Sequence, residues 1–259
     1  MPWWIQPMIG KSIPLSLPRR FVCDLVTLAK SFPTVPVQRT FSLATLAEVR
    51  LASALKPSWP AIFTLAYARV AATTPELRRF YVAWPYARLY ELPSSVVSIA
   101  IEREYEGERC VFVGKKRSPE LLSLADVQAW INHLQTAPIE SVKDFRRALR
   151  IAALPSLVRQ LLWRLALNWP RQRANYFGTF GVSVYSSLGA ESLHPIAPCT
   201  TVLTYGVIDN DGHVPVRLIY DHRVMDGATV ARALNHLEAE LNGSILQELS
   251  GSSRMKRAA

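Results

Sequence analysis

Apolar residues recur at helical spacing in five parts of this sequence before residue 170. An apolar side chain at every third or fourth position predicts a helix with one buried face. The pattern is clearest in residues 61–73 and 124–134, and it also occurs in 21–31, 43–56 and 142–169. We therefore expect a helix in each of these segments.

Strand-like segments are shorter and lie between turn residues. Residues 96–101 and 110–113 flank Glu106-Gly107, and this arrangement predicts a β-hairpin. Residues 33–41 alternate around two prolines, which favours an edge strand because proline cannot donate a ladder hydrogen bond. The final third of the chain adds three strand candidates, at 180–185, 201–208 and 214–220.

The last helical pattern is followed by a basic segment. Its apolar face carries Val230, Leu234, Leu237 and Leu241. Gly243 predicts the end of this helix. The mixture of helices and strands, without repeats or a linker, predicts a single α+β domain. Its expected bounds are 21–245, between an N-terminal arm at 1–20 and a flexible basic tail at 246–259.

Composition restricts the class of protein. Hydrophobic residues make up 49% and charged residues 19% of the 259 positions, which suits a folded domain with a substantial core. The three cysteines are widely spaced, so they favour a reducing compartment and suggest neither a disulfide framework nor a zinc site. There is no signal-peptide pattern and no apolar run that could span a bilayer. We expect a cytoplasmic protein with no bound metal.

The net charge of +10 indicates an anionic partner. Coenzyme A, acidic lipid or an acidic carrier protein would fit, and so would a surface whose excess arginine serves solubility alone. Nucleic-acid binding is not expected, because no nucleic-acid-binding motif accompanies the charge. Residues 157–173 interleave apolar and basic side chains, which suits either a helix at the inner face of the membrane or a core helix with solvated arginines.

The most informative segment is 221–227, Asp-His-Arg-Val-Met-Asp-Gly, between a predicted strand and the last helix. Histidine side chains exchange protons near neutral pH, so His222 is a candidate general base. Asp226 stands where a helix N-cap belongs, and its carboxylate either accepts hydrogen bonds from first-turn amides or orients the loop. Gly227 permits a close backbone approach or an unusual dihedral angle.

A second candidate site lies at 184–189, Val-Tyr-Ser-Ser-Leu-Gly. A hydroxyl at a strand end, just before a glycine, can donate a hydrogen bond to an oxyanion. An ordinary strand-to-turn junction is the alternative interpretation. The sequence has no Gly-x-Ser-x-Gly elbow here, so a hydrolase with a serine nucleophile gains little support.

Together these segments resemble the catalytic domain of the dihydrolipoamide acyltransferases. Those domains are the cores of the 2-oxo acid dehydrogenase complexes and share the chloramphenicol acetyltransferase fold. The likeness lies in Asp-His-Arg-x-x-Asp-Gly followed by an amphipathic helix, and in residues 178–189 and 194–196. It is good over 178–242 and weak but collinear before it. It implies a chloramphenicol acetyltransferase-like α+β fold, with a mixed central sheet flanked by helices in a single domain. It also makes the expected domain an acyltransferase catalytic domain.

The resemblance also implies a mechanism. His222 would deprotonate a thiol, hydroxyl or amine acceptor, which attacks a thioester directly without an acyl-enzyme. Ser186 would hydrogen-bond the tetrahedral oxyanion. Asp226 would be structural, paired with Arg20 or Arg19. The active site would lie between the subunits of a homotrimer.

The chain also departs from that family. No lipoylation motif or lipoyl domain accompanies the expected catalytic domain, so we expect a stand-alone enzyme. Its co-substrate would be an acyl-coenzyme A or a carrier phosphopantetheine thioester, with no tightly bound cofactor, and an acyl carrier protein is a candidate partner. Three rival hypotheses stand beside it: a non-catalytic trimeric scaffold, a peripheral membrane-binding module, and a hydrolase in which water replaces the acceptor.

Overall fold

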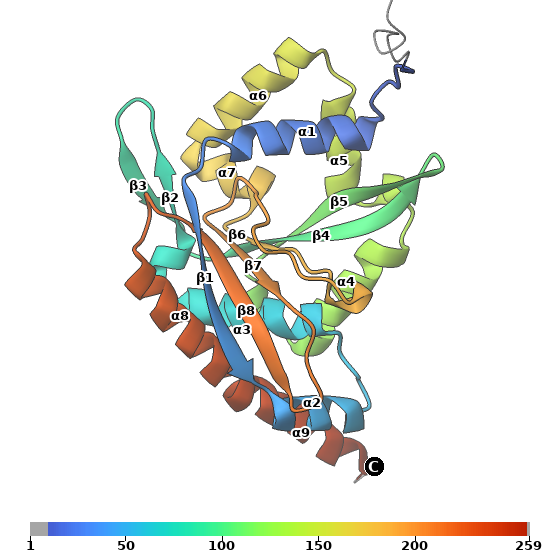
Figure 1. The fold of residues 1–259 in the computed structure, drawn as a ribbon, viewed down its shortest axis with the longest axis vertical. Helices are drawn as coiled ribbons and strands as arrows, with labels where there is room; N and C mark the ends of the chain where they lie inside the picture. Colours follow the sequence, from blue (N-terminus) through green and yellow to red (C-terminus); the bar gives the residue numbers. More distant parts are fainter. Residues whose placement is uncertain (1–9, 258–259) are drawn as a thin grey trace, which may run out of the picture.

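Six strands form the central sheet, in the order β1-β8-β7-β6-β4-β5 (Figure 1). The computed structural model describes residues 10–257. β6 pairs in parallel with β4 and β7, and the remaining neighbours are antiparallel, so the sheet is mixed, as the sequence predicts. The strands are β1 Thr34–Ser42, β4 Val96–Tyr105, β5 Glu108–Arg117, β6 Phe180–Val182, β7 Thr201–Tyr205 and β8 His213–Asp221.

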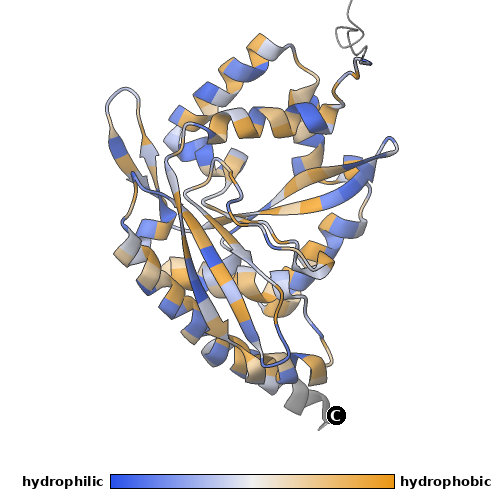
Figure 2. Ribbon diagram, viewed as in Figure 1, coloured by the Kyte–Doolittle hydropathy of each residue, from blue (hydrophilic) through white to orange (hydrophobic). Residues whose placement is uncertain are grey.

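Three helices pack on the sheet to form the main core. They are α3 Trp59–Thr73, α4 Leu124–Thr136 and α8 Gly227–Glu240, with the short α2 Ala44–Ala52 nearby. Ten of the fifteen residues of α3 are buried, which explains why this helix is apolar on nearly all sides. β8 alternates apolar and polar positions along much of its length, as expected for a strand with one face in the core (Figure 2).

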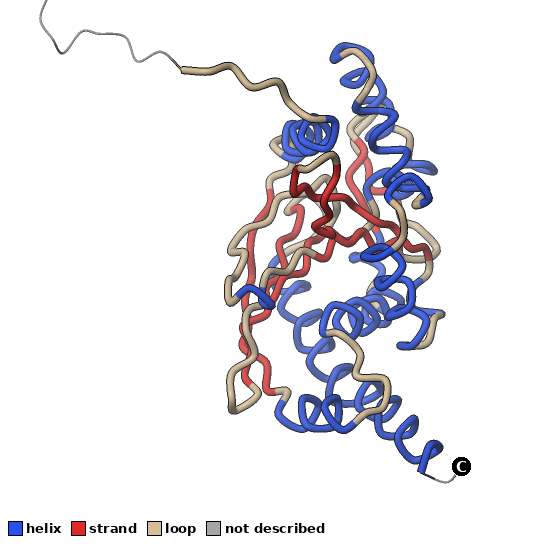
Figure 3. Tube along the Cα trace, turned by 90° about the vertical axis from the view of Figure 1, so that its right-hand side faces the viewer, coloured by secondary structure: helices blue, strands red, loops and turns tan. Residues whose placement is uncertain are grey.

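A second apolar cluster lies between four other helices and β5. These are α1 Leu17–Ala29, α5 Lys143–Ala152, α6 Ser156–Asn168 and α7 Pro170–Phe177. Asp24 of α1 joins α6 through the Arg159 guanidinium at 2.8 Å and the Trp163 indole at 3.0 Å. Figure 1 shows this group above β4 and β5 and the main-core helices below, and the view turned by 90° shows most helices on one side of the strands (Figure 3).

The apolar outer face of α6 is uncovered. Its large exposed side chains include Leu157, Leu161 and Leu165, at 79%, 58% and 55% exposure. The predicted amphipathic stretch 157–173 is not one helix, because Pro170 begins α7. Within residues 10–257, no helix combines the length and apolar character needed to cross a bilayer. Contact of this stretch with a membrane surface stays a prediction.

The two predicted boundaries differ from the structure. α1 begins at Leu17, inside the expected arm, after Ser16 accepts a hydrogen bond from the Arg19 amide. At the other end, α8 runs through a π-helical turn, Leu241–Ile245, into α9 Leu246–Arg257. Gly243 therefore does not end the helix, and the expected flexible tail is helical up to residue 257. Ile245 and Leu249 are buried, so the apolar face continues beyond the glycine. Residues 1–9 of the arm lie outside the described residues.

Of the two hairpins described here, the sequence predicts one and not the other. β4 and β5 form the predicted hairpin, with Glu106 and Gly107 both at positive φ in its turn. β1 is an edge strand of this chain, as its prolines predict, and pairs with β8 alone. The separate hairpin of β2 Arg79–Val82 and β3 Arg88–Glu91 was not predicted, because its strands are too short to show a pattern.

Gly212 offers a test of how tightly the β7–β8 connection is built. Its φ is +80°, and an added Cβ would lie 2.4 Å from the backbone N and Cα of Ala44. Gly107 has a similar φ of +78° but open space around it. We expect Gly212→Ala to lower the free energy of unfolding by about 3 kcal/mol, because backbone strain and a backbone clash add. Gly107→Ala should cost only about 1 kcal/mol.

Urea denaturation of the two variants beside the wild type measures this difference. Equal destabilisation by both substitutions would mean that the hairpin moves away from α2 at little cost.

Candidate functional site

His222 follows directly after β8, and its backbone is held by the neighbouring strand. Its amide donates a hydrogen bond of 3.1 Å to the Pro33 carbonyl, next to the point where Thr34 pairs with Asp221. The ring lies 5.5 Å from the Tyr220 ring, and the side chain is 50% exposed. The histidine is therefore positioned by the sheet yet accessible to a substrate, as a general base must be.

Asp226 and Gly227 lie beside this histidine. An Asp226 carboxylate oxygen is 3.8 Å from His222 Nδ1, and the side chain is 86% exposed. Asp226 does occupy the N-cap of α8, but its carboxylate makes no capping hydrogen bond, and its carbonyl accepts from Thr229 instead. Gly227 has no positive φ, and a Cβ there would lie 3.4 Å from the Tyr220 hydroxyl. Of its two predicted roles, only the close approach fits.

Asp221 anchors the loop that carries His222. Its carboxylate is 1% exposed and accepts from the Arg223 guanidinium at 2.9 and 2.7 Å and from the Arg223 amide at 3.1 Å. That guanidinium lies over the Phe32 and Tyr81 rings, at 5.1 and 4.6 Å. A buried ion pair is favourable only when hydrogen bonds satisfy both charged groups. The three hydrogen bonds from Arg223 to the Asp221 carboxylate meet this condition.

Arg173 of α7 completes the charge arrangement around Asp221. Burial lowers its pKa to about 10, and the nearby Asp221 carboxylate partly offsets that effect. Its guanidinium donates to the Tyr81 carbonyl at 2.6 Å and lies 4.6 Å from the Phe80 ring. This contact is not predictable from the sequence, because α7 is distant in the chain from the loop that it supports.

The predicted arginine partners of Asp226 lie elsewhere. Arg20 donates to the Leu15 carbonyl at 3.1 Å, and Arg19 pairs with Glu108 of β5 at 3.6 Å. Among the described residues neither arginine forms an ion pair with Asp226. The reason is that α1 packs on β5 and α5, so these arginines belong to that part of the molecule.

Ser186 begins a single 3₁₀ turn, Ser186–Leu188, after β6, and is partly buried. Phe180 pairs with Thr201, and Thr201 with Tyr220, so the start of β6 is level with the end of β8. Because β6 runs antiparallel to β8, the chain after β6 leaves the sheet at the opposite end from His222. One chain therefore does not bring His222 and Ser186 together.

The Ser186 turn borders two cavities. One, of about 270 Å³, lies between α1 and the sheet, and we call it the apolar cavity. Its lining includes Phe21 and Leu25 of α1, Ala100 of β4, Val113 of β5, and Tyr185. The other, of about 330 Å³, lies between this turn and α4. Tyr185 lines both cavities and Ser187 and Leu188 line the second, whereas Ser186 lines neither.

His194 lies close to the His222 loop, a contact that the sequence does not predict. Its Nε2 and the Thr34 hydroxyl are 2.9 Å apart, one residue from the carbonyl that holds the His222 amide. The contact joins the loop after the Ser186 turn to the start of β1. Only the folded chain shows this, since 160 residues separate the two partners.

Comparisons place this arrangement among known folds. No protein-family model and no curated protein matches the chain. Many solved structures match the chain, and the three described next each match nearly its whole length. A probable dihydrolipoamide acetyltransferase from Listeria monocytogenes has a TM-score of 0.65 and 19% identity, covering 90% of this chain and 94% of its own. The dihydrolipoamide acetyltransferase of Azotobacter vinelandii has a TM-score of 0.65 and 18% identity, with coverages of 95% and 98%.

The third is a truncated catalytic core of the 2-oxoacid dehydrogenase complex from Thermoplasma acidophilum. It matches with a TM-score of 0.64 and 17% identity, over 90% of this chain and 99% of its own. This chain has the fold of the dihydrolipoamide acetyltransferase catalytic cores. The predicted α+β architecture is confirmed. We therefore interpret His222 and Ser186 by their positions in the acetyltransferase fold.

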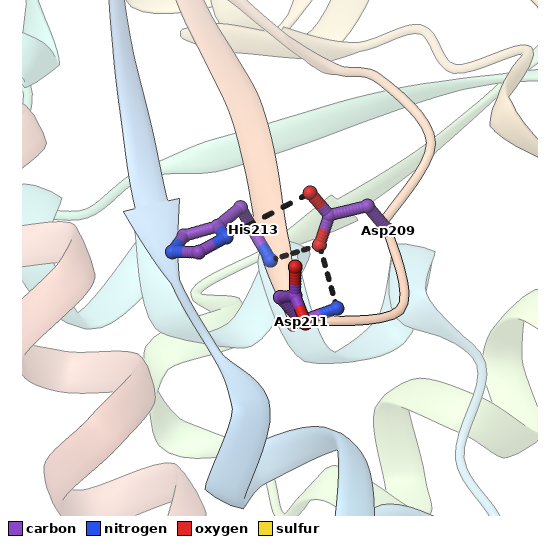
Figure 4. Close-up of side chains that lie close together, drawn as sticks. All are labelled: Asp209, Asp211 and His213. Carbon is purple, nitrogen blue, oxygen red and sulfur yellow. Dashed lines mark hydrogen bonds and ion pairs between the residues drawn. The ribbon is translucent and has the colours of Figure 1, made fainter.

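One further group of side chains consists of possible metal ligands. Asp209, Asp211 and His213 lie close together in the β7–β8 connection (Figure 4). Asp209 Oδ1 accepts hydrogen bonds from the Asp211 and His213 amides, at 3.0 and 2.7 Å. Turn geometry accounts for this grouping, since an aspartate commonly bonds to amides that follow it in a turn.

The buried carboxylate of Asp221 gives a prediction about the acetyltransferase fold. Asp221→Asn should lower the free energy of unfolding by about 3 kcal/mol, because Arg223 and the buried Arg173 lose the charge that compensates them. Asp211→Asn, at an exposed position in the turn, is the control and should change it by less than about 0.5 kcal/mol. Urea denaturation at neutral pH measures both. A stability like that of the wild type for Asp221→Asn would show that aromatic stacking alone holds the two arginines.

Proposed function

We propose that this protein is an acyltransferase that moves an acyl group from a thioester to a thiol, hydroxyl or amine acceptor, with His222 as general base. The observation that carries the proposal is the position of His222 at the end of β8 in an acetyltransferase fold, held by its amide and half exposed. In the Azotobacter enzyme, a serine, a histidine and an asparagine have been investigated for roles in catalysis. This chain offers Ser186, His222 and, four residues beyond it, Asp226.

The chemistry needs one base and one hydrogen-bond donor. His222 takes the proton from the acceptor as the acceptor attacks the thioester carbonyl. The negative charge that develops on the carbonyl oxygen receives a hydrogen bond from the Ser186 hydroxyl. When the tetrahedral intermediate collapses, the C–S bond breaks and the imidazolium returns the proton to the thiolate. The Asp226 carboxylate, 3.8 Å from Nδ1, stabilises the transient imidazolium.

Two copies of the chain would supply one active site. The chain leaves β6 and β8 at opposite ends of the sheet's strands, so His222 of one subunit must meet Ser186 of another. A closed ring of three subunits, each meeting the next through the same pair of surfaces, satisfies this requirement. This supports a homotrimer, the assembly expected from the sequence.

The donor is an acyl-coenzyme A or an acyl group on a carrier phosphopantetheine. The excess of basic residues suits such phosphate-bearing donors, and no tightly bound cofactor is needed for the reaction. The apolar cavity beside the Ser186 turn accommodates an aliphatic part of the substrate.

The first test is thiol release from acyl-coenzyme A thioesters of increasing chain length, with a thiol, hydroxyl or amine acceptor present. We expect release to be selective for chain length in the wild type. His222→Ala should lower it by at least about 10²-fold, because the attack loses its general base. His213→Ala is the matched control and should react like the wild type.

The rival hypotheses give different results. A scaffold or a membrane-binding module would release no thiol, and a hydrolase would release it without any acceptor. Equal release by the wild type and His222→Ala would overturn the role of this histidine.

The second test asks whether the site lies between subunits. Ser186→Ala should lower kcat by about 10²–10³-fold if the hydroxyl stabilises the oxyanion. Inactive His222→Ala and Ser186→Ala proteins, unfolded together and refolded as a mixture, should regain about a quarter of wild-type activity, because one random interface in four pairs two intact residues.

Ser187→Ala, the neighbouring hydroxyl, is the control for the first measurement and should retain activity. For the second, each variant refolded alone must stay inactive, and sedimentation should show trimers throughout. A mixture no more active than its components would place both residues in one subunit and contradict the shared site.

A further inference from the structure

A third cavity, also of about 330 Å³, is lined mainly by charged side chains, and we call it the basic pocket. It lies where the end of β5 meets the first turn of α5 and the last turns of α7. Four cations line it: Lys115, Arg117, Lys143 and Arg147. Asp144 is the one carboxylate among its lining residues. The excess of positive charge is therefore local and concave, which strengthens its attraction for an anion.

Lys115 uses the only carboxylate of the basic pocket. Asp144 accepts from the Lys115 amide at 2.8 Å and lies 3.4 Å from the Lys115 ammonium. The Lys115 side chain is 10% exposed, and burial lowers its pKa although Asp144 opposes the shift. The aspartate is thus already committed to one lysine and does not compensate the other cations.

Three cations remain without a carboxylate among the residues that the structure describes. Arg117 donates to the Asn175 side chain at 2.5 Å, and Arg147 donates to the Asn175 carbonyl at 3.3 Å. Lys143 is the first residue of α5, and Val142 before it offers no side chain to cap that helix. The uncapped first turn of a ten-residue helix adds a further positive potential. Neutral partners position these charges but do not neutralise them.

The basic pocket adjoins the apolar cavity on the same face of the sheet. Val111 and Val113 line the apolar cavity, and Lys115, the next residue on that face of β5, lines the basic pocket. Tyr176 lines both. Val111 and Lys115 are four strand residues apart, or ~13 Å. An extended chain of eight carbons is about 9 Å long, and with its head group it spans most of that length.

We propose that the basic pocket and the apolar cavity together bind an amphipathic substrate, with an anionic head group on Arg117, Lys143 and Arg147 and an aliphatic chain directed toward the Ser186 turn. The head group is a phosphate or a carboxylate, since both satisfy the same guanidinium and ammonium donors. The basic pocket and the apolar cavity would hold the unreactive end of the substrate, while its other end reacts. This role in the reaction rests on the proposed acyl transfer, whereas binding of the amphipathic molecule does not.

Isothermal titration with octyl phosphate, inorganic phosphate, octanol and decanoate tests the proposal. Octyl phosphate should bind at least about tenfold more tightly than either phosphate or octanol alone, because head and chain contribute together. Decanoate in place of octyl phosphate shows which head group is preferred. The double variant Arg117→Gln/Lys143→Gln should weaken octyl phosphate by at least about tenfold.

Two variants separate the contributions. Arg109→Gln removes the same charge from the other end of β5 and should bind like the wild type. Ala100→Leu fills part of the apolar cavity and should reduce the gain from the octyl chain while leaving inorganic phosphate unchanged. Equal affinity for octyl phosphate and phosphate, or wild-type binding by the double variant, would overturn the proposal. His222→Ala should bind octyl phosphate normally, so a failure of acyl transfer is distinguishable from a failure of this site.

Discussion

The reversal of strand direction between β7 and β8 decides where chemistry can take place. β6 and β7 run one way, and β8 runs back, so the loops after β6 and β8 leave the sheet at opposite ends. The two candidate loops carry Ser186 and His222. The proposed mechanism needs both residues and therefore needs a second copy of the chain. The sheet must be stable, because it holds both loops in position for the contact between subunits.

Local patterns were sufficient to predict most elements of the fold. The hairpin around Glu106-Gly107 and the edge strand β1 rest on turn and proline chemistry that acts within a few residues. Gly243 misled the prediction because helix continuation is decided by burial. Ile245 and Leu249 pack into the core, and this offsets a cost of about 1 kcal/mol for a glycine inside a helix.

The members of the candidate site could be proposed from the sequence, but their arrangement could not. His222 and Ser186 were identified because residue type and position at a strand end indicate chemistry. The partner of Asp226 was not, since Arg20 lies on a helix that packs elsewhere. The cluster around Asp221 joins segments far apart in the chain, and its key arginine, Arg173, lies within what the sequence presents as a solvated basic helix.

A comparison of two pairs of arginines supports the proposed anionic ligand of the basic pocket. Arg173 and Arg223 are compensated by a buried carboxylate and by aromatic faces, so they stabilise the fold. Among residues 10–257, Arg117 and Arg147 have neutral partners only, and they share their pocket with two lysines. Mutual repulsion of like charges costs free energy, and folding alone gives no reason to gather them around a cavity. An anionic ligand supplies that reason, and the adjoining apolar cavity indicates what the ligand carries behind its charge.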